Sequence, residues 1–424
     1  MNTSFKHLLR VLRVSSSQSF SYDYWLKCAL AALGCAGSIC WNVDRKQVSN
    51  SYFAYVEHLD DRYGEISLGN YSHWTLKEIE EQSVSIARAL NFGARLTYDS
   101  AKLKGLEDAK EQLLSVRNLV LTGCGSSYHA AQFGQALFKS LRLMNTITAI
   151  NASQFSIHDL PNLSPGVIAI SQSGERPDVN AAIAEIVLHK VPCISLVNQQ
   201  GSTLSRLTQA GAYLNAGREL SMSSTKSFMN ACVVLTEVAL WLSKQINPED
   251  SLRRQEIVRQ LHRLPMTAGS TIAQSKRATM ELAKDIVDKD RIIILGKGPG
   301  EAIAHEGAYA FKQISKVHAE AYAGSALKHG PFALIETGTP IILLVFDDEF
   351  SKDMNLALEQ VKGRNATTIV ITSNPKLINQ NKADYIIQVD DNGELTPLLG
   401  VIPLQLLAYY LSLSRGQDPD HINV

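Results

Sequence analysis

A three-part unit recurs along most of this chain: a short apolar run, a turn rich in glycine or serine, and a helical segment. The first series of units starts after Lys110. Its apolar runs predict strands at 118–122, 146–150, 166–170, 192–197 and 212–214. Helices are expected up to about Leu137, over 178–189 and over 225–244. Strands that alternate with helices predict a parallel sheet with helices on both faces.

The same unit returns in the second half of the chain. We expect a helix over 271–288, a strand over 291–295, a glycine-rich turn and a helix over 301–315. Later strands are expected at 340–346, 367–372 and 384–389, and a last helix at 398–414. The prediction is therefore an α/β protein with two tandem αβα domains, residues 111–250 and 270–424, with a polar helical connector over 246–269. A length of 424 residues fits two such domains.

The first 110 residues do not follow this pattern. Residues 1–72 are interpreted as a divergent leader with a hairpin at 52–68, and residues 73–110 as a helical linker whose helix covers 73–100. The start of the leader is basic and rich in serine, which also fits a signal or transit peptide. The apolar stretch between Trp25 and Trp41 is shorter than the roughly 20 residues that a membrane-spanning helix needs. We favour a soluble leader.

Composition narrows the class of function. Lysine and arginine total 41, as do aspartate and glutamate, so the net charge is zero. A neutral chain lacks the broad positive field of a nucleic-acid-binding protein. The six cysteines are scattered without metal-ligand spacing, which is typical of reduced thiols in the cytoplasm. We expect a cytoplasmic protein that binds neither nucleic acid nor membrane.

Two turns directly follow strands of the buried type. They are 123–127, with the sequence GCGSS, and 171–175, with SQSGE. Serine hydroxyls, backbone N–H groups and a helix N-terminus together can bind phosphate. Because ligands of open α/β sheets lie beyond the carboxyl ends of the strands, two such turns in one sheet favour a phosphate site. The simpler alternative is that both turns are serine-capped helix starts.

Residues 304–331 carry the densest set of acid–base groups, with three histidines and two glutamates. They lack the HExxH spacing of a zinc site and fall on different expected elements, so no metal is expected. The turn at 296–300, GKGPG, lacks the GxGxxG order of a dinucleotide site, and no cofactor is expected. His329 is the candidate for proton transfer near neutral pH, in a KHGP segment that suits a loop over a pocket.

Several motifs occur in an order that resembles a known family. They are CGSSYH at 124–129, SQSGE at 171–175, STKSF at 224–228 and HAEAY followed by LKHGP within 318–331. Together they resemble the isomerase half of the glutamine–fructose-6-phosphate aminotransferases, which consists of two sugar-isomerase (SIS) domains. The resemblance starts at His73 with HWTLKEIEEQ, which is similar to the family's linker. Amino-sugar-6-phosphate deaminases share this scaffold, and RGQDPD at 415–420 is closer to that branch.

The resemblance implies a ligand and a set of site residues. The ligand would be a hexose or hexosamine 6-phosphate, bound by a homodimer. The positions that match phosphate ligands of the family are Ser127, Ser171, Gln172 and Ser173. The positions that match the lining of the sugar are Cys124, Gly125, Ser126, Met222 and Ser224. Arg176 replaces a threonine and can still bind phosphate through its guanidinium. Glu306 matches a sugar-contacting glutamate, and His329 the ring-opening histidine, which the family supplies across its dimer.

Two positions depart from the family's pattern. Where the family has a lysine and a proton-transferring glutamate, this sequence has Ala310 and Gln313. A glutamine amide cannot accept the α-carbon proton at neutral pH, whereas a carboxylate can. The resemblance does not extend to the family's glutaminase domain or to its C-terminal lysine tail. Ammonia would then come from a glutaminase partner in trans.

Two functions stay open at this point. The first is a sugar-phosphate isomerase or deaminase of amino-sugar metabolism, with His329 for ring opening and Glu306 in support. The second is a catalytically impaired homologue that senses a hexose phosphate or regulates a full-length aminotransferase. The first depends on the hydroxyl-rich turns and the KHGP segment, and the second on Ala310 and Gln313.

Overall fold

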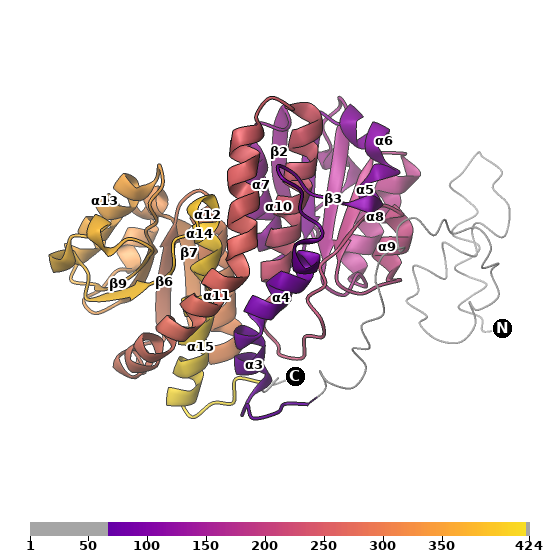
Figure 1. Ribbon diagram of the computed structural model, residues 1–424. Helices are drawn as coiled ribbons and strands as arrows, with labels where there is room; N and C mark the ends of the chain where they lie inside the picture. Colours follow the sequence, from indigo (N-terminus) through magenta and orange to yellow (C-terminus); the bar gives the residue numbers. More distant parts are fainter. Residues whose placement is uncertain (1–66, 421–424) are drawn as a thin grey trace, which may run out of the picture. The chain divides into compact units, whose positions relative to one another are not determined.

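The structure, a computed structural model, describes residues 67–420 and forms two five-stranded parallel sheets (Figure 1). The leader and most of the hairpin expected at 52–68 lie outside these residues. The first sheet consists of β1 (Asn118–Gly123), β2 (Thr146–Asn151), β3 (Pro165–Ser171), β4 (Cys193–Val197) and β5 (Gly211–Tyr213). The second consists of β6 (Arg291–Gly296), β7 (His318–Ala323), β8 (Pro340–Leu344), β9 (Thr367–Thr372) and β10 (Tyr385–Gln388).

The two sheets have the same topology. The strand order is β2-β1-β3-β4-β5 in the first and, read from the matching edge, β7-β6-β8-β9-β10 in the second. All pairings within the sheets are parallel. The expected fold class, α/β with two tandem αβα units and parallel sheets, is confirmed.

Helices cover both faces of each sheet. Those of the first unit are α7 (Ser126–Ser140), α8 (Pro177–Leu188), α9 (Thr203–Thr208) and α10 (Lys226–Ile246). Those of the second are α12 (Pro299–Ala310), α13 (Ser351–Lys362), α14 (Thr396–Leu399) and α15 (Val401–Ser414). The long α11 (Ser251–Asp285) lies between the two sets in sequence. Short segments before the first sheet are α3 (Trp74–Glu80), α4 (Gln82–Ala89), η1 (Asn91–Gly93), α5 (Lys104–Glu107) and α6 (Lys110–Ser115).

Alternate residues of the strands enter different cores. In β3, Ile168 and Ile170 join a large central core, whereas Val167 and Ala169 join a smaller one under α8. In β6, Ile294 belongs to the same central core, and the outer face packs under α13. Burial on both faces explains why these strands appear in the sequence as continuous apolar runs. The central core is shared by both sheets and contains the apolar sides of α7, α10, α12 and α15.

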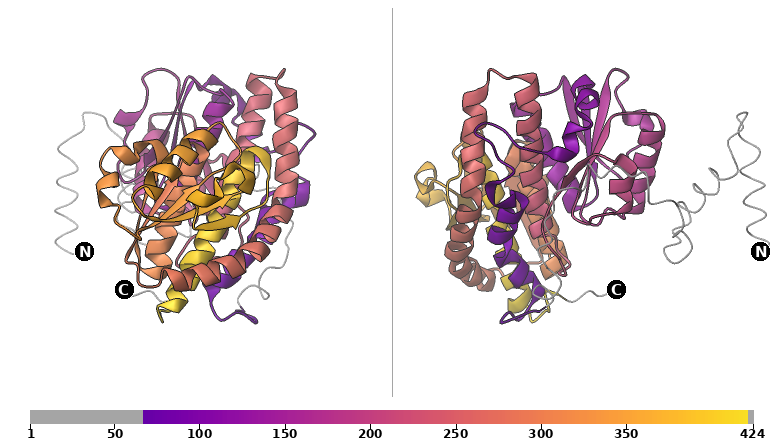
Figure 2. Two further views of the ribbon diagram at one scale, coloured as in Figure 1. Left: turned by 90° about the vertical axis from the view of Figure 1, so that its left-hand side faces the viewer. Right: turned by 45° about the vertical axis from the view of Figure 1, so that its right-hand side comes forward.

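Two helix predictions were wrong in their extent. The expected connector 246–269 and helix 271–288 form one helix, α11, although Pro265 lies inside it. Pro265 cannot donate to the carbonyl four residues earlier, but its own carbonyl accepts a hydrogen bond from the Ser83 hydroxyl at 2.7 Å. Contacts along α11 with α4 and α15 hold it continuous (Figures 1 and 2). The helix expected over 73–100 ends at Ala89, because the chain turns at Asn91 and Phe92 with positive φ.

Other elements were missed. The sequence predicts no strand between the helix expected over 301–315 and the strand expected at 340–346, but residues 318–323 form β7 at the edge of the second sheet. Its sequence HAEAYA has a histidine, a glutamate and three alanines, and one half-exposed edge strand needs no apolar run. The helices α9 and α13 were also not expected. The π-helical turn Phe311–Ser315 ends the helix expected over 301–315.

The linker is fastened to the body by buried polar contacts. The carboxylate of Asp420 accepts hydrogen bonds from the backbone N–H groups of Trp74 and Thr75, at 2.6 and 2.9 Å, and so satisfies the start of α3. Arg95 donates to the carbonyls of Ala89 and Tyr213 and pairs with Glu237 of α10 at 3.3 Å. Burial raises the pKa of Glu237 to about 7, although Arg95 opposes the shift.

One helical stretch within 67–420 is long and apolar enough to cross a membrane by composition. It covers 393–414, and 94% of its apolar window is buried inside the protein. It is therefore a core helix of this fold.

The raised pKa of Glu237 predicts a pH dependence of stability. Because the folded pKa of about 7 exceeds the ordinary value of 4.5, the folded state holds a proton that the unfolded state loses between these values. This group therefore destabilises the fold progressively as the pH rises from about 4.5 to 7. We expect Glu237→Gln to gain thermal stability relative to the parent protein as the pH rises from 5 to 8.

The measurement is the melting temperature of both proteins across that range. Glu249→Gln, which changes an exposed glutamate just after α10, is the control and should differ from the parent by a constant amount. A constant difference for Glu237→Gln as well would contradict the assignment.

Candidate functional site

The site lies where the strand order of the first sheet reverses. β1 and β3 are neighbours at its centre, and the chain proceeds from them toward opposite edges. Because the chain leaves these two strands in opposite directions, the turns at their carboxyl ends diverge. The space between the turns is a crevice that can bind a ligand. The turn after β1 begins α7, and the turn after β3 leads into α8. These are the two serine-containing turns that the sequence indicates.

The turn after β1 depends on two glycines. Gly125 has φ 56° and ψ −129°, a conformation that favours glycine. A Cβ atom on Gly123 would lie 2.8 Å from Cβ of Ser127 and 2.9 Å from the carbonyl oxygen of Ile170. Because neither glycine has a side chain, the backbone folds closely over the end of β3 and directs the first turn of α7 toward the crevice.

A small cleft opens at this position. Its lining residues are Ser126, Ser127, Gln172, Leu214, Ser224, Ser227, Phe228 and Ala231. Four of them, Ser126, Ser127, Gln172 and Ser224, are site residues that the sequence indicates. Ser126 is 8% exposed, and its hydroxyl oxygen is buried without a hydrogen-bond partner. A buried hydroxyl without a partner costs stability unless a ligand or water satisfies it.

The turn after β3 forms one edge of the cleft through Gln172. The backbone N–H of Gly174 donates to Oγ of Ser171 at 3.0 Å, and that of Glu175 donates to Oγ of Ser173 at 3.2 Å. Both oxygens therefore act as acceptors, so both hydroxyl protons can still be donated to an anion. Ser171 is buried and Ser173 is half-buried.

The remaining first-domain candidates lie around the cleft rather than in its lining. Burial, and then the negative charge of Asp178, raise the pKa of the Cys124 thiol, while Arg176 lowers it. The thiol is therefore protonated at neutral pH and lies within electrostatic reach of Arg176. Arg176 precedes α8 and is exposed, as is Met222, with 43% exposure.

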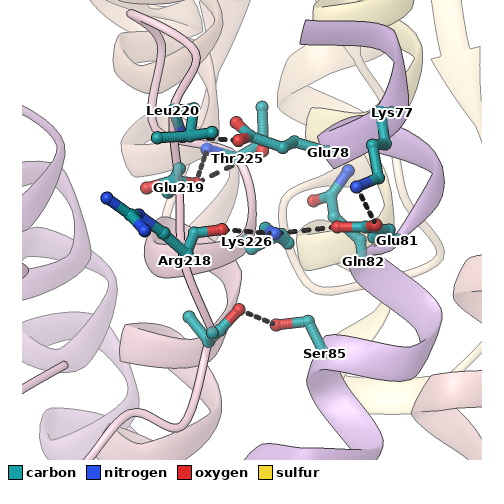
Figure 3. Close-up of polar contacts among 12 residues, drawn as sticks. Lys77, Glu78, Glu81, Gln82, Ser85, Arg218, Glu219, Leu220, Thr225 and Lys226 are labelled. Atoms are coloured by element: carbon teal, nitrogen blue, oxygen red, sulfur yellow. Dashed lines mark hydrogen bonds and ion pairs between the residues drawn. The ribbon is translucent and has the colours of Figure 1, made fainter. Parts of the chain in front are cut away.

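A carboxylate from the linker holds the loop that carries Met222 and Ser224 (Figure 3). Glu78 of α3 is 1% exposed and accepts hydrogen bonds from the backbone N–H of Leu220 at 2.5 Å and of Ser221 at 3.2 Å. The Ser221 hydroxyl also donates to it. Burial raises the pKa of Glu78, whereas these donors lower it.

Two more charged groups close the same loop. Lys226, only 2% exposed, pairs with Glu81 of the linker at 2.8 Å and donates to the carbonyl of Arg218 at 2.7 Å (Figure 3). Glu219 accepts from the backbone N–H of Thr225 at 2.8 Å and from the Ser227 hydroxyl. The sequence does not indicate the linker carboxylates Glu78 and Glu81, because their partners on this loop lie 142 and 145 residues away.

The second-domain candidates lie in three different environments. Glu306 is fully buried on α12, where its Oε2 is 2.6 Å from Nδ1 of His129 on α7, and its Oε1 has no partner. Ala310 is 1% exposed at the end of α12. Gln313 follows in the π-helical turn and has a buried Oε1 without a hydrogen-bond partner. His329 is exposed, at the end of the 3-10 segment Gly324–Lys328. None of the four lines the first-domain cleft.

The matching turn of the second sheet is closed by its own side chains. Gly298 has φ 58° and ψ −130°, nearly the values of Gly125. A Cβ atom there would lie 2.2 Å from the Phe350 ring. Lys297 pairs with Asp353, and Pro299 and Gly300 occupy the positions of Ser126 and Ser127. The phenyl ring and the missing hydroxyls leave this turn without the donors of the first. Across 67–420, no group of three or more His, Cys, Asp or Glu side chains could hold a metal ion.

Comparison with known proteins gives the class of this fold. The sequence matches the SIS domain family over residues 112–240 and 285–415, so the chain belongs to that family. The match covers both parallel sheets and the cleft residues of the first.

The chain also resembles individual proteins. It is 34% identical over 388 residues to a probable glutamine–fructose-6-phosphate aminotransferase (isomerizing) of Acanthamoeba polyphaga mimivirus, with 89% of this chain and 62% of the relative covered. It is 30% identical to the human glutamine–fructose-6-phosphate aminotransferase (isomerizing) 2, with 89% of this chain and 55% of the relative covered. The chain thus spans little more than half the length of these relatives.

A solved structure agrees with this match. The C-terminal domain of glucosamine-fructose-6-phosphate aminotransferase from Francisella tularensis superposes with a TM-score of 0.76 and 26% identity, covering 83% of this chain and 99% of that one. A glucosamine-6-phosphate deaminase from Thermotoga maritima, 22% identical with a TM-score of 0.60, shares the fold.

The linker contacts predict that Glu78 orders the loop 218–225. Hydrogen bonds to a charged group stabilise by about 1.5–3 kcal/mol each, so Glu78→Ala should speed amide exchange of Leu220 and Ser221 by roughly tenfold or more. Hydrogen exchange with mass spectrometry or NMR measures this. Glu80→Ala, on the same helix but paired with Tyr71 and Lys276, is the control. Equal exchange in Glu78→Ala and the parent protein would show that the loop is held by other contacts.

Proposed function

We propose that this protein binds a hexose or hexosamine 6-phosphate in the cleft of its first SIS domain and acts in amino-sugar metabolism. The observation that carries the proposal is the cleft itself. Four hydroxyls or amides from both strand-end turns and from the 218–225 loop converge there, and the hydroxyl of Ser126 is buried without a partner. Neutral donors suffice for a phosphate at a helix N-terminus, which is consistent with the zero net charge.

In this proposal the ligand groups have separate partners. The phosphate is bound by Ser127, Ser171, Gln172 and Ser173, with Arg176 at the rim, where it can turn toward the cleft. The sugar lies against Cys124, Gly125, Ser126, Met222 and Ser224. The relatives' names join fructose 6-phosphate to amino transfer, and this supports a ketose or amino-sugar phosphate as the ligand.

The reaction proposed is aldose–ketose isomerisation or deamination, with His329 opening the sugar ring. His329 is exposed on its loop, and a second copy of the chain is the partner that would bring it to a cleft. We also propose a glutaminase partner in trans as an ammonia source, and a cytoplasmic location. The alternative is a sugar-phosphate sensor with impaired turnover. Ala310 and Gln313 favour it, because neither supplies a base for the α-carbon proton.

Binding is the common test of both functions. Titration calorimetry with fructose 6-phosphate and glucosamine 6-phosphate should detect binding of at least one. Ser127→Ala should weaken it by roughly tenfold or more, because hydrogen bonds to a charged phosphate are worth about 1.5–3 kcal/mol. Ser140→Ala, at the far end of the same helix, should leave the affinity unchanged. Neither heat nor a thermal shift with either sugar up to millimolar concentration would refute the proposed function.

Turnover separates the enzyme from the sensor. We expect Gln313→Glu to raise the isomerisation rate by about 10²–10⁴-fold, because the carboxylate can accept the proton that the amide cannot. Gln313→Met, which fills similar space without a base, is the control. A coupled assay for glucose 6-phosphate and an assay for ammonia release measure the rates.

The outcomes are distinct. Turnover in the parent protein that His329→Ala abolishes supports the enzyme. Intact binding with no turnover in the parent supports the sensor. A Gln313→Glu rate no higher than that of Gln313→Met would remove position 313 from the chemistry.

A further inference from the structure

Tyr309 of the second domain reaches the phosphate-site turn of the first. It lies on α12, one residue before Ala310, and its hydroxyl oxygen is close to Gly125. A Cβ atom built on Gly125 would lie 3.1 Å from this oxygen and 3.4 Å from the ring carbon that carries it. The side chain therefore crosses the junction where α7 packs against α12. The resemblance to the aminotransferase family does not single out this position.

The helix places Tyr309 on the face that carries the other candidate groups. It is three residues after Glu306 and four before Gln313, spacings that bring side chains to one side of a helix. Glu306 faces α7, since it bonds to His129. Tyr309 faces the same helix near its first turn, where the cleft serines lie.

The ring of Tyr309 is held in one orientation by a chain of contacts. His129 meets it edge-on, with centroids 5.5 Å apart and planes at 80°. His129 is fixed on one side by Glu306 at 2.6 Å and on the other by His305, stacked at 5.9 Å. Burial and then the neighbouring His129 lower the pKa of His305 to about 4, so His305 is neutral at pH 7 and does not repel His129. The tyrosine is thus pre-oriented before any ligand arrives.

The hydroxyl of Tyr309 is available. It makes no hydrogen bond with any residue in the described part of the chain, and the side chain is half-buried. The residue after Gly125 is Ser126, whose buried hydroxyl also has no partner. A half-buried tyrosine hydroxyl usually finds a partner. Two unpartnered hydroxyls, one from each domain, therefore lie next to Gly125, and one of them, that of Ser126, belongs to a residue that lines the cleft.

We propose that the Tyr309 hydroxyl donates a hydrogen bond to a hydroxyl or carbonyl oxygen of the sugar bound in the first-domain cleft. This inference rests on the proposed binding of a hexose phosphate. Tyr309 would contact the sugar and not the phosphate, because Gly125 is among the residues proposed to line the sugar. Gly125 is then required twice, for its positive φ and for the space that the tyrosine occupies. The ligand bridges the two SIS domains of one chain.

The test compares two ligands on one substitution. Tyr309→Phe keeps the ring and its contact with His129 and removes only the hydroxyl. Calorimetry with fructose 6-phosphate, and competition of inorganic phosphate against it, give both affinities. We expect Tyr309→Phe to lower the affinity for fructose 6-phosphate by about 3- to 10-fold, the effect of one hydrogen bond. The affinity for inorganic phosphate should not change. Tyr410→Phe on α15, whose ring packs on Tyr409 away from the cleft, should change neither.

The outcomes separate this inference from the proposed function. If the parent protein binds fructose 6-phosphate and Tyr309→Phe binds it equally well, Tyr309 is not a sugar contact. If the affinities for both ligands fall equally, the hydroxyl contacts the phosphate or stabilises the fold, and the assignment to the sugar is likewise overturned. If the parent binds neither fructose 6-phosphate nor glucosamine 6-phosphate, the proposed function itself fails and this inference fails with it.

Discussion

The packing of α7 against α12 is the contact on which the arrangement of this protein depends. Each helix begins at the glycine turn after the first strand of its own sheet, β1 or β6, and both bury their apolar sides in the core that the two sheets share. Inside this interface lies a buried polar pair, the Glu306 carboxyl group and the His129 imidazole, and such groups are costly to bury unless they are hydrogen-bonded. A 2.6 Å contact and a stacked neutral His305 meet that requirement. The pair fixes the rotation of each helix, and therefore the direction in which the first turn of α7 presents its serines.

The two sheets share one topology but differ in what their turns offer. Gly125 and Gly298 have nearly the same backbone angles, so the local geometry is repeated. In the first sheet the space beyond the turn contains hydroxyls, and in the second it contains the ring of Phe350. The second domain instead contributes side chains to the first: Tyr309 lies against Gly125, and Glu306 orients His129. In this repeated fold the first unit carries the hydroxyl-lined cleft, and the second unit packs against the turn beside it.

The sequence predicts well those features that depend on neighbouring residues. Apolar runs such as 166–170, buried on both faces, identify strands, and the serines after them identify the cleft, since a turn follows its strand directly. The sequence predicts poorly those contacts whose two residues are far apart along the chain. Glu78 and Lys226 read as ordinary charged residues, but their partners are 142 and 145 residues away. β7 was missed because an edge strand of alanines and charged residues has no apolar run. Glu306 resembles a sugar contact in sequence, and only the fold places His129 beside it.

The continuity of α11 has a mechanical consequence. A helix of 35 residues is roughly 50 Å long at 1.5 Å per residue, and it is supported along its length by α4 and α15. Enzymes that close two lobes over a substrate normally bend at a short flexible segment between them. Here the last long segment of the chain before the second sheet is α11, a continuous helix that packs against α4 and α15. Movement that admits a ligand is then expected in smaller parts, and the loop 218–225 is held in position by a few hydrogen bonds from the linker. Access to the cleft would then be governed by the segment that precedes the first sheet, through its direct contacts with this loop.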